Sequence, residues 1–178
     1  MFRFILILAI LVSPAVKASS TLYYSGTARV IDLKTGKESQ EEMVVEKTIN
    51  PKNNLITEIA CVKRNGSAAS VYPVYMKVQG NKILQISNAP NFKGTLSGTG
   101  KLQGKAWKWN YLTFSMLFDT GKGNIRIEDD NFVVNSTLIA RKRIFYREIP
   151  VQLWEEEAKE INLEEFSLQK KHLDCPAF

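Results

Sequence analysis

The most constraining feature of the sequence is a long succession of short runs in which apolar and polar residues alternate. Such alternation is typical of β-strands with one buried and one solvated face, and clusters of Gly, Pro, Asn and Asp separate the runs. Because tight turns join the runs and no helical pattern lies between them, they indicate one antiparallel meander. A sheet of this size tends to close, since closure removes its exposed edges. About nine runs are present, at 23–33, 42–49, 55–64, 72–78, 82–87, 94–102, 106–118, 124–128 and 132–146.

The C-terminal region has a different pattern, which is typical of a helix. Pro150 can occupy a first helical turn, and apolar residues follow it at spacings of three, four and three. Asn162 and Glu165 match a capping box that would start a second short helix. The sequence therefore predicts a fold that is mainly β, a single antiparallel meander closing into a barrel of about 8–10 strands, with a C-terminal helical segment at about 150–171 packed on it.

One run departs from simple alternation. In 106–118 the apolar residues hold odd positions up to Tyr111 and even positions from Leu112 onward, so the apolar side switches near Asn110. A β-bulge near Asn110 would return both sets to one face and bend the strand as a closing barrel requires. The alternative is a strand covered on both faces, with the C-terminal segment over its outer side. The two sets are Trp107, Trp109 and Tyr111, then Leu112, Phe114, Met116 and Phe118.

Residues 1–18 have the pattern of a cleavable secretory signal peptide. A short basic start precedes an apolar run, and small or modest residues lead to Ala18, where signal peptidase would cut. The apolar run is shorter than the roughly 20 residues that a membrane-spanning helix needs, and a retained anchor is the alternative. We expect residues 19–178 to form a single β-barrel domain of an exported protein, either periplasmic or secreted.

A signal peptide, a meander of about eight to ten strands and a trailing helix resemble the lipocalin-like, or calycin-like, small β-barrel proteins. The likeness covers most of the mature chain and rests on the rhythm of the strands. Where lipocalins carry a glycine-tryptophan signature near the first strand, this chain has Tyr24-Ser25-Gly26-Thr27. The resemblance implies a barrel whose interior often holds a small apolar ligand, and it transfers no site residue.

The chain has two cysteines, Cys61 and Cys175. In an oxidising compartment two thiols in one small domain usually pair, so we expect a disulfide that ties the C-terminal tail to an early strand. Two separate thiols are the alternative. Because there is no CxxC motif and His172 is the single histidine, we expect no metal and no cofactor.

Charge and motifs argue against two broad functions. The whole chain carries a net charge of +6 at pH 7, and Arg3 and Lys17 of the signal peptide contribute to it. The short basic stretch 141–143 is too small for a nucleic-acid groove. We expect no enzyme, because no nucleophile elbow occurs and His172 lies in a basic tail; an unrecognised hydrolase is a minor alternative. We expect no membrane-spanning segment after signal cleavage.

We therefore expect an exported binding protein that holds a small apolar or amphiphilic ligand inside the barrel. The alternative is an envelope structural or interaction domain whose barrel is filled by its own side chains. If alternation continues along 132–146, Lys142 and Tyr146 point inward with Phe132, and Lys142 could meet a carboxylate or phosphate head group. The alternative is a solvated lysine: Lys142 would then extend into solvent at the strand end, beside its arginine neighbours. Candidate ligand-binding residues are Trp107, Trp109, Phe114, Met116, Lys142 and Tyr146.

Overall fold

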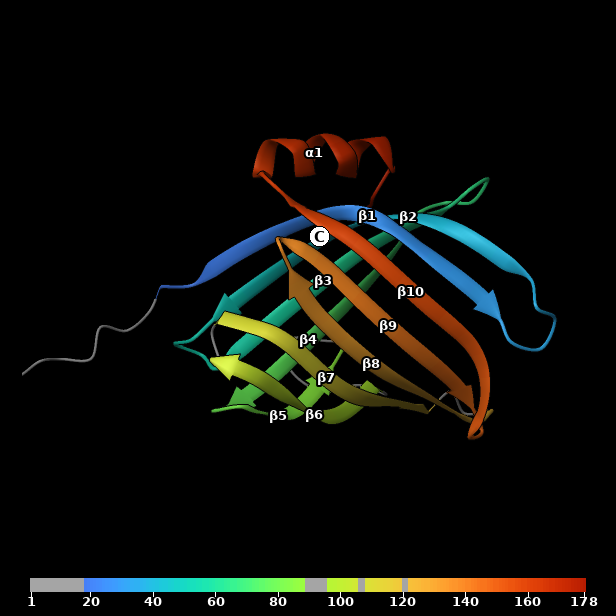
Figure 1. Cartoon of the computed structure of the whole chain (residues 1–178), viewed down its shortest axis with the longest axis horizontal. Helices are drawn as coiled ribbons and strands as arrows, with labels where there is room; N and C mark the ends of the chain where they lie inside the picture. The colour runs from blue at the N-terminus through green and yellow to red at the C-terminus, as the bar shows by residue number, and fades with distance from the viewer. Residues whose placement is uncertain (1–17, 89–95, 106–107, 120–121) are drawn as a thin grey trace, which may run out of the picture.

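The computed structural model of the chain describes residues 18–88, 96–105, 108–119 and 122–178 (Figure 1). It is one closed antiparallel barrel in which each strand pairs with the next along the chain, and the last strand pairs with the first. The predicted meander and its closure are confirmed. The elements are β1 (Ser20–Asp32), β2 (Glu38–Asn50), β3 (Leu55–Arg64), β4 (Ser70–Gln79), β5 (Lys82–Ser87), β6 (Leu96–Lys105), β7 (Lys108–Asp119), β8 (Asn124–Val134), β9 (Thr137–Tyr146), β10 (Ile149–Ile161) and α1 (Leu163–His172).

The predicted signal peptide, apart from Ala18, lies outside the described residues. Within the described part of the chain, no helix combines the length and the apolar character needed to cross a membrane.

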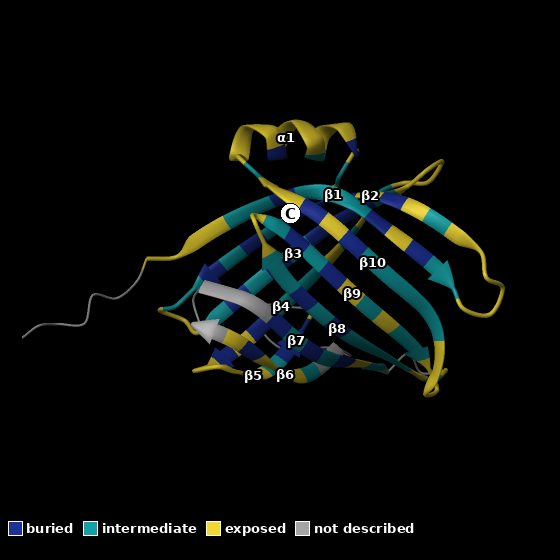
Figure 2. Ribbon diagram, in the orientation of Figure 1, coloured by how far each residue is buried: buried dark blue, intermediate teal, exposed yellow. Residues whose placement is uncertain are grey.

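Strand register decides which side chains face the interior. Tyr24 of β1 lies opposite Val45 of β2, and Ala28 lies opposite Glu41; all four are buried. Buried and exposed residues alternate along most strands, which Figure 2 shows as bands of dark blue between lighter ones. Nearly every strand contributes to one apolar core in this way, so the core fills much of the inside of the barrel.

The expected run 132–146 is two strands and not one. Asn135 and Ser136 have φ of 49° and 60° and form a two-residue turn between β8 and β9. As a result, the side chains that face the interior are those of odd-numbered residues in β8 and of even-numbered residues in β9. Leu138 therefore lies in the core as expected, whereas Phe132 lies on the outer wall.

The helix expected from about residue 150 is wrong over its first half. Ile149–Ile161 is the strand β10, and α1 begins only at Leu163. The apolar spacing fits a helical stripe, but the segment also alternates, with Glu156 buried and its neighbour Glu155 on the outer wall. Because β10 pairs with both β1 and β9, it satisfies backbone groups that would otherwise form two open edges.

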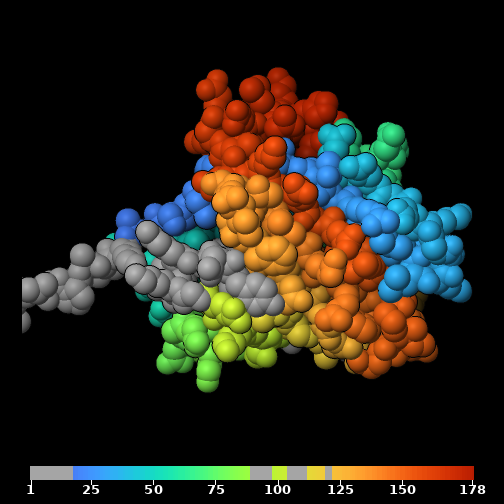
Figure 3. All heavy atoms as spheres, in the orientation of Figure 1, coloured from blue at the N-terminus to red at the C-terminus, as the bar shows by residue number. Residues whose placement is uncertain are grey.

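Helix α1 packs on the outside of the barrel over β1 and β2, where it forms a ridge on the surface (Figures 1 and 3). It begins at the predicted capping box, in which the Asn162 side chain accepts a hydrogen bond from Glu165 N and the Glu165 side chain accepts one from Asn162 N. Phe166 is the buried residue of the helix, with its ring centroid 4.7 Å from that of Tyr23.

The predicted disulfide between Cys61 and Cys175 is confirmed. Cys61 is fully buried on the outer side of β3, in a second apolar cluster with Val44, Phe166 and Leu173. Since the two cysteines are 114 residues apart, the bond fixes the tail that follows α1 to the barrel wall. A disulfide of this kind fits an exported protein.

The bulge predicted near Asn110 is confirmed by the backbone register of β6 and β7. Gln103 pairs with Tyr111, and the next residue, Gly104, pairs with Trp109, which leaves Asn110 as an extra residue in β7. An added residue of this kind bends a strand, as the wall of a closed barrel requires.

Candidate functional site

Among the described residues, five ionisable side chains gather inside the barrel, and we call them the charged cluster; Glu41, which is also buried, pairs instead with Arg64. Each occupies an inward position on a different strand, and each is buried or nearly so. Moving an ion out of water costs several kcal/mol, so buried charges need partners. The charged cluster consists of Lys47 in β2, Glu58 in β3, Asp129 in β8, Lys142 in β9 and Glu156 in β10.

Each lysine of the charged cluster contacts a carboxylate. Lys47 Nζ lies 2.5 Å from Glu58 Oε2. Lys142 Nζ lies 2.5 Å from Glu156 Oε1 and 3.7 Å from Asp129 Oδ2. Two ammonium groups therefore face three carboxyl groups, and Asp129 shares Lys142 with Glu156 at the longer of the two distances.

Asp129 is held instead by a neighbouring amide. Asn131 is fully buried on the same face of β8, and its Nδ2 donates a hydrogen bond to Asp129 Oδ1 over 2.5 Å. Burial raises the pKa of Asp129 to about 8; Lys142 opposes this shift, and the carboxylates of Glu156 and Glu58 add to it. The Asp129 carboxyl therefore keeps its proton at neutral pH, and the charged cluster is then close to neutral overall.

For Lys142 and Glu58, neighbouring charges outweigh the effect of burial on the pKa. Burial alone would lower the pKa of Lys142, but the carboxylates of Glu156 and Asp129 raise it above its ordinary value. Burial alone would raise the pKa of Glu58, but the ammonium groups of Lys47 and Lys142 lower it. Lys142 and Glu58 therefore stay charged near neutral pH.

An apolar row lies beside the charged cluster, toward the end of the barrel where β9 turns into β10. On β8, β9 and β10 the next inward position beyond the cluster residue is apolar, and all three of these side chains are partly exposed. At the opposite end Leu102, Leu112 and Leu138 are fully buried. The apolar side chains near the β9–β10 end are therefore partly accessible to solvent, as is Val133 at the opposite end. The apolar row consists of Ile127, Ile144 and Trp154.

Three of the predicted ligand-binding residues lie at this site. Phe114 and Met116 are buried in β7, opposite Asp129 and Ile127 in the ladder with β8. Lys142 belongs to the charged cluster itself. The structure thus brings these three side chains together around the middle of the barrel, next to carboxylates that were not predicted.

The remaining predicted residues do not join the site within the described structure. Tyr146 is exposed at the end of β9, where its hydroxyl donates a hydrogen bond to the carbonyl oxygen of Lys122 over 3.1 Å. Trp107 lies outside the described residues. Trp109 is part of β7, but its side chain is not among the described ones.

Lys142 does not extend outward into solvent beside Arg141 and Arg143, so the alternative of a solvated surface lysine is wrong. Its side chain is 18% exposed and its nitrogen contacts Glu156. The two arginines point to the outer wall, where they pair with Glu155 and Glu128. The opposite orientation of adjacent residues in a strand separates the three basic side chains.

Four members of the charged cluster were not predicted as site residues. A signal was available for Lys47, because it has the same parity as the buried Val45 and so stands on the apolar face of its strand. Asp129 looked like part of a turn, and Glu156 like part of a helix. Glu58 carried no signal beyond being a charged residue within a largely apolar run.

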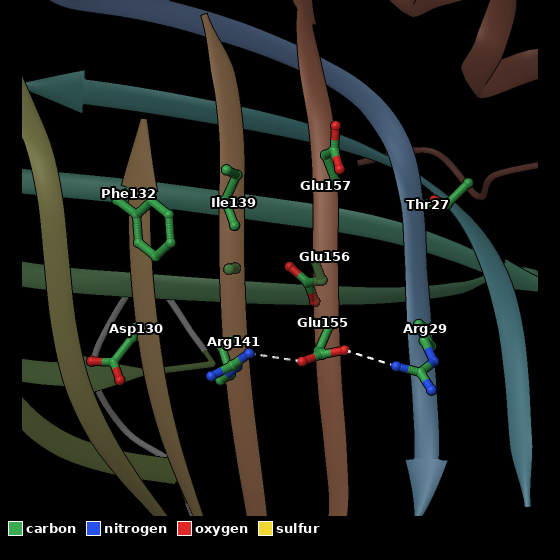
Figure 4. Close-up of a pocket in the computed structure, with 10 residues that line it drawn as sticks. Thr27, Arg29, Asp130, Phe132, Ile139, Arg141, Glu155, Glu156 and Glu157 are labelled. Carbon is green, nitrogen blue, oxygen red and sulfur yellow. Dashed lines mark hydrogen bonds and ion pairs between the residues drawn. The ribbon is translucent and has the colours of Figure 1, made fainter. Parts of the chain in front are cut away.

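A depression of about 570 Å³ lies on the outer wall across β8, β9, β10 and β1 (Figure 4). Both arginines that line it pair with Glu155: Arg141 Nη2 lies 2.9 Å from Glu155 Oε1, and Arg29 Nη1 lies 3.2 Å from Glu155 Oε2. Arg29 also pairs with Glu38. Exposed ion pairs of this kind are common on surfaces and are weak evidence for a site. The charged cluster and the apolar row are the stronger candidate.

Comparison with known proteins adds no family to this description: the chain matches no family model, and no curated protein matches it. Within the described ranges, no group of three or more His, Cys, Asp or Glu side chains could hold a metal ion. His172 is exposed on α1, with Nε2 3.8 Å from Glu42 Oε2, and lies apart from the charged cluster. The candidate site therefore rests on the geometry of the barrel interior.

Proposed function

We propose that this chain is an exported, non-enzymatic binding protein that takes a small amphiphilic ligand into the β9–β10 end of a lipocalin-like barrel. The apolar part of the ligand would lie against Ile127, Ile144 and Trp154, and its head group would point to the charged cluster. The observation that carries the proposal is the apolar row, which faces inward and yet is partly exposed directly beside buried charges.

The apolar row supplies the driving force for such binding. Its three side chains lie on adjacent strands, with Ile127 and Ile144 directly paired. Covering apolar surface gains about 25 cal/mol per Å², or about 0.8 kcal/mol for each methylene that leaves water. A ligand with a short alkyl chain could therefore bind measurably without any polar contact.

The charged cluster supports a ligand-related role because stability alone does not explain it. Replacing buried ion pairs with well-packed apolar side chains is often neutral or stabilising by about 1–4 kcal/mol. Lys142 lies between two carboxylates and has the most exposed side chain of the charged cluster. A polar head group entering from the β9–β10 end would meet Lys142 and its partners first.

A separate observation favours a second candidate function. Lys47, Met76, Leu102 and Leu112 are completely buried, so the interior around them is filled by the protein's own side chains. A barrel filled throughout would act as an envelope structural or interaction domain without a ligand. The two functions differ in whether the partly exposed β9–β10 end accepts a molecule.

Titration with N-phenyl-1-naphthylamine, an uncharged probe that fluoresces in apolar surroundings, tests the proposal. We expect saturable binding by the wild type and about tenfold weaker binding when Ile127 and Ile144 are both changed to alanine. Leu117→Ala is the matched control, because Leu117 is an exposed side chain at the same end of the barrel. Its affinity should equal that of the wild type.

Absence of saturable binding by the folded wild type would favour the filled barrel. Equal affinity in the wild type and in the Ile127→Ala, Ile144→Ala variant would place the probe elsewhere and overturn the proposed site. If that variant does not fold, methyl chemical shifts of Ile127 and Ile144 in the wild type decide, since bound probe must move both.

A further inference from the structure

We propose that the head group accepted by this barrel is cationic, an alkylammonium or a group of similar charge, and not a carboxylate or phosphate. The inference rests on the proposed function and specifies its ligand. The charged cluster contains more acidic than basic groups, and both of its lysines already contact carboxylates of the chain.

The two lysines offer little to an anionic ligand. Lys142 Nζ has Glu156 at 2.5 Å and Asp129 at 3.7 Å, and Lys47 Nζ has Glu58 at 2.5 Å. An entering carboxylate would have to separate one of these pairs and would leave a buried anion without its partner, which is strongly unfavourable. The head group first considered for Lys142 from the sequence is therefore disfavoured.

Asp129 offers the matching site for a cation. Its nearest lysine is farther away than the contact distance of the other two pairs, and it is 1% exposed. An ammonium group beside it would let the carboxyl ionise inside the barrel, because an opposite charge offsets the desolvation that otherwise keeps it protonated. Burial raises the pKa of Asp129 to about 8 in the ligand-free barrel, so binding near neutral pH would release a proton.

A second feature, the amide that holds Asp129, favours a hydrogen-bond donor. Asn131 is fully buried beside Asp129, and among the described residues its Oδ1 has no hydrogen-bond partner. An unsatisfied buried acceptor is costly, and a ligand N–H would satisfy it. Phe114 is the register partner of Asp129 in the β7–β8 ladder and is buried in the same core, so an aromatic residue, a type that can attract cations, stands on the neighbouring strand.

The test compares three probes with the same ten-carbon chain: decylamine, decanol and decanoate. Each is titrated against the protein at pH 7, below its micelle concentration, by displacement of N-phenyl-1-naphthylamine. We expect decylamine to bind about tenfold more tightly than decanol, and decanoate to bind most weakly. In Asp129→Asn the advantage of decylamine over decanol should disappear while decanol still binds. Asp130→Asn, which changes the outward neighbour, should retain the wild-type order.

Calorimetry in buffers of different ionisation enthalpy gives a second readout. Decylamine should release a proton on binding to the wild type and to Asp130→Asn, and none on binding to Asp129→Asn. Equal or tighter binding of decanol or decanoate would overturn the cationic head group and leave the proposed function intact. Failure of the naphthylamine and of all three alkyl probes to bind the folded protein would instead reject the proposed function.

Discussion

Lys142 and Glu156 form a diagonal ion pair across β9 and β10, with Nζ and Oε1 2.5 Å apart. They are not direct register partners: Lys142 lies opposite Trp154, and Glu156 lies opposite Ala140. Diagonal neighbours on one face of a sheet are within reach of long side chains. The pair therefore depends on the register of β10, the strand that closes the barrel.

We expect Lys142→Met to lower the free energy of unfolding by about 3–5 kcal/mol, because it leaves the buried carboxylate of Glu156 without its cation. Adding Glu156→Gln to the same chain should recover a large part of the loss. Lys101→Met, at an exposed position in β6, should change stability by no more than about 0.5 kcal/mol. Urea denaturation measures all three, and equal effects of the two lysine changes would contradict the buried pair.

Stability should fall as pH rises from about 4 to about 8. The pKa of Asp129 is raised from 3.8 to about 8 in the folded protein, so over this range the folded state holds a proton that the unfolded state has lost. Its contribution to the free energy of unfolding is complete below pH 3.8, falls by up to about 1.4 kcal/mol per pH unit, and is gone above pH 8. Denaturation curves at a series of pH values should show this slope in the wild type.

Asp129→Asn isolates the effect. The asparagine does not titrate, so the variant should lack this loss of stability. The free energy of unfolding of the variant relative to that of the wild type should therefore rise with pH across the same range. Asp130→Asn should keep the wild-type slope. A wild type and an Asp129→Asn variant with parallel pH profiles would show that Asp129 titrates normally.

Loss of the disulfide should weaken the whole fold and free the C-terminal tail. In the chain-entropy description, a bond between residues as distant as Cys61 and Cys175 contributes about 5 kcal/mol. We expect the double change to serine to lower stability by about this amount, and amide exchange in α1 to accelerate more than exchange in β7. Thiol titration of the unfolded, unreduced wild type should find no free thiol, and two free thiols would exclude the bond.

Gly98 of β6 should not tolerate a side chain. A Cβ at this position would lie 1.9 Å from the carbonyl oxygen of Ser115 in β7, so the backbone of one strand would have to move. We expect Gly98→Ala to cost about 3 kcal/mol or more in thermal or urea unfolding. Thr99→Ala, at the exposed position next to it, should change stability by about 0.5 kcal/mol or less. A Gly98→Ala protein as stable as the wild type would contradict this close approach.

Local patterns in the sequence determined much of the barrel. Period-two alternation and turn residues predict the meander, and the change of parity at Asn110 predicts the bulge, because both signals depend on residues close together in the chain. The capping box at Asn162 and Glu165 likewise places the start of α1. The pairing of Cys61 with Cys175 followed because no other cysteine competes.

Tertiary structure alone decided the state of β10 and the composition of the charged cluster. The segment Ile149–Ile161 carries both a helical stripe and a period-two alternation, and the open edges of β1 and β9 select the strand. Only after that closure does Glu156 reach Lys142, and only across the barrel do Lys47 and Glu58 approach Asp129. Their burial and their pKa values arise from contacts between residues far apart in the sequence, and no local pattern specifies those contacts.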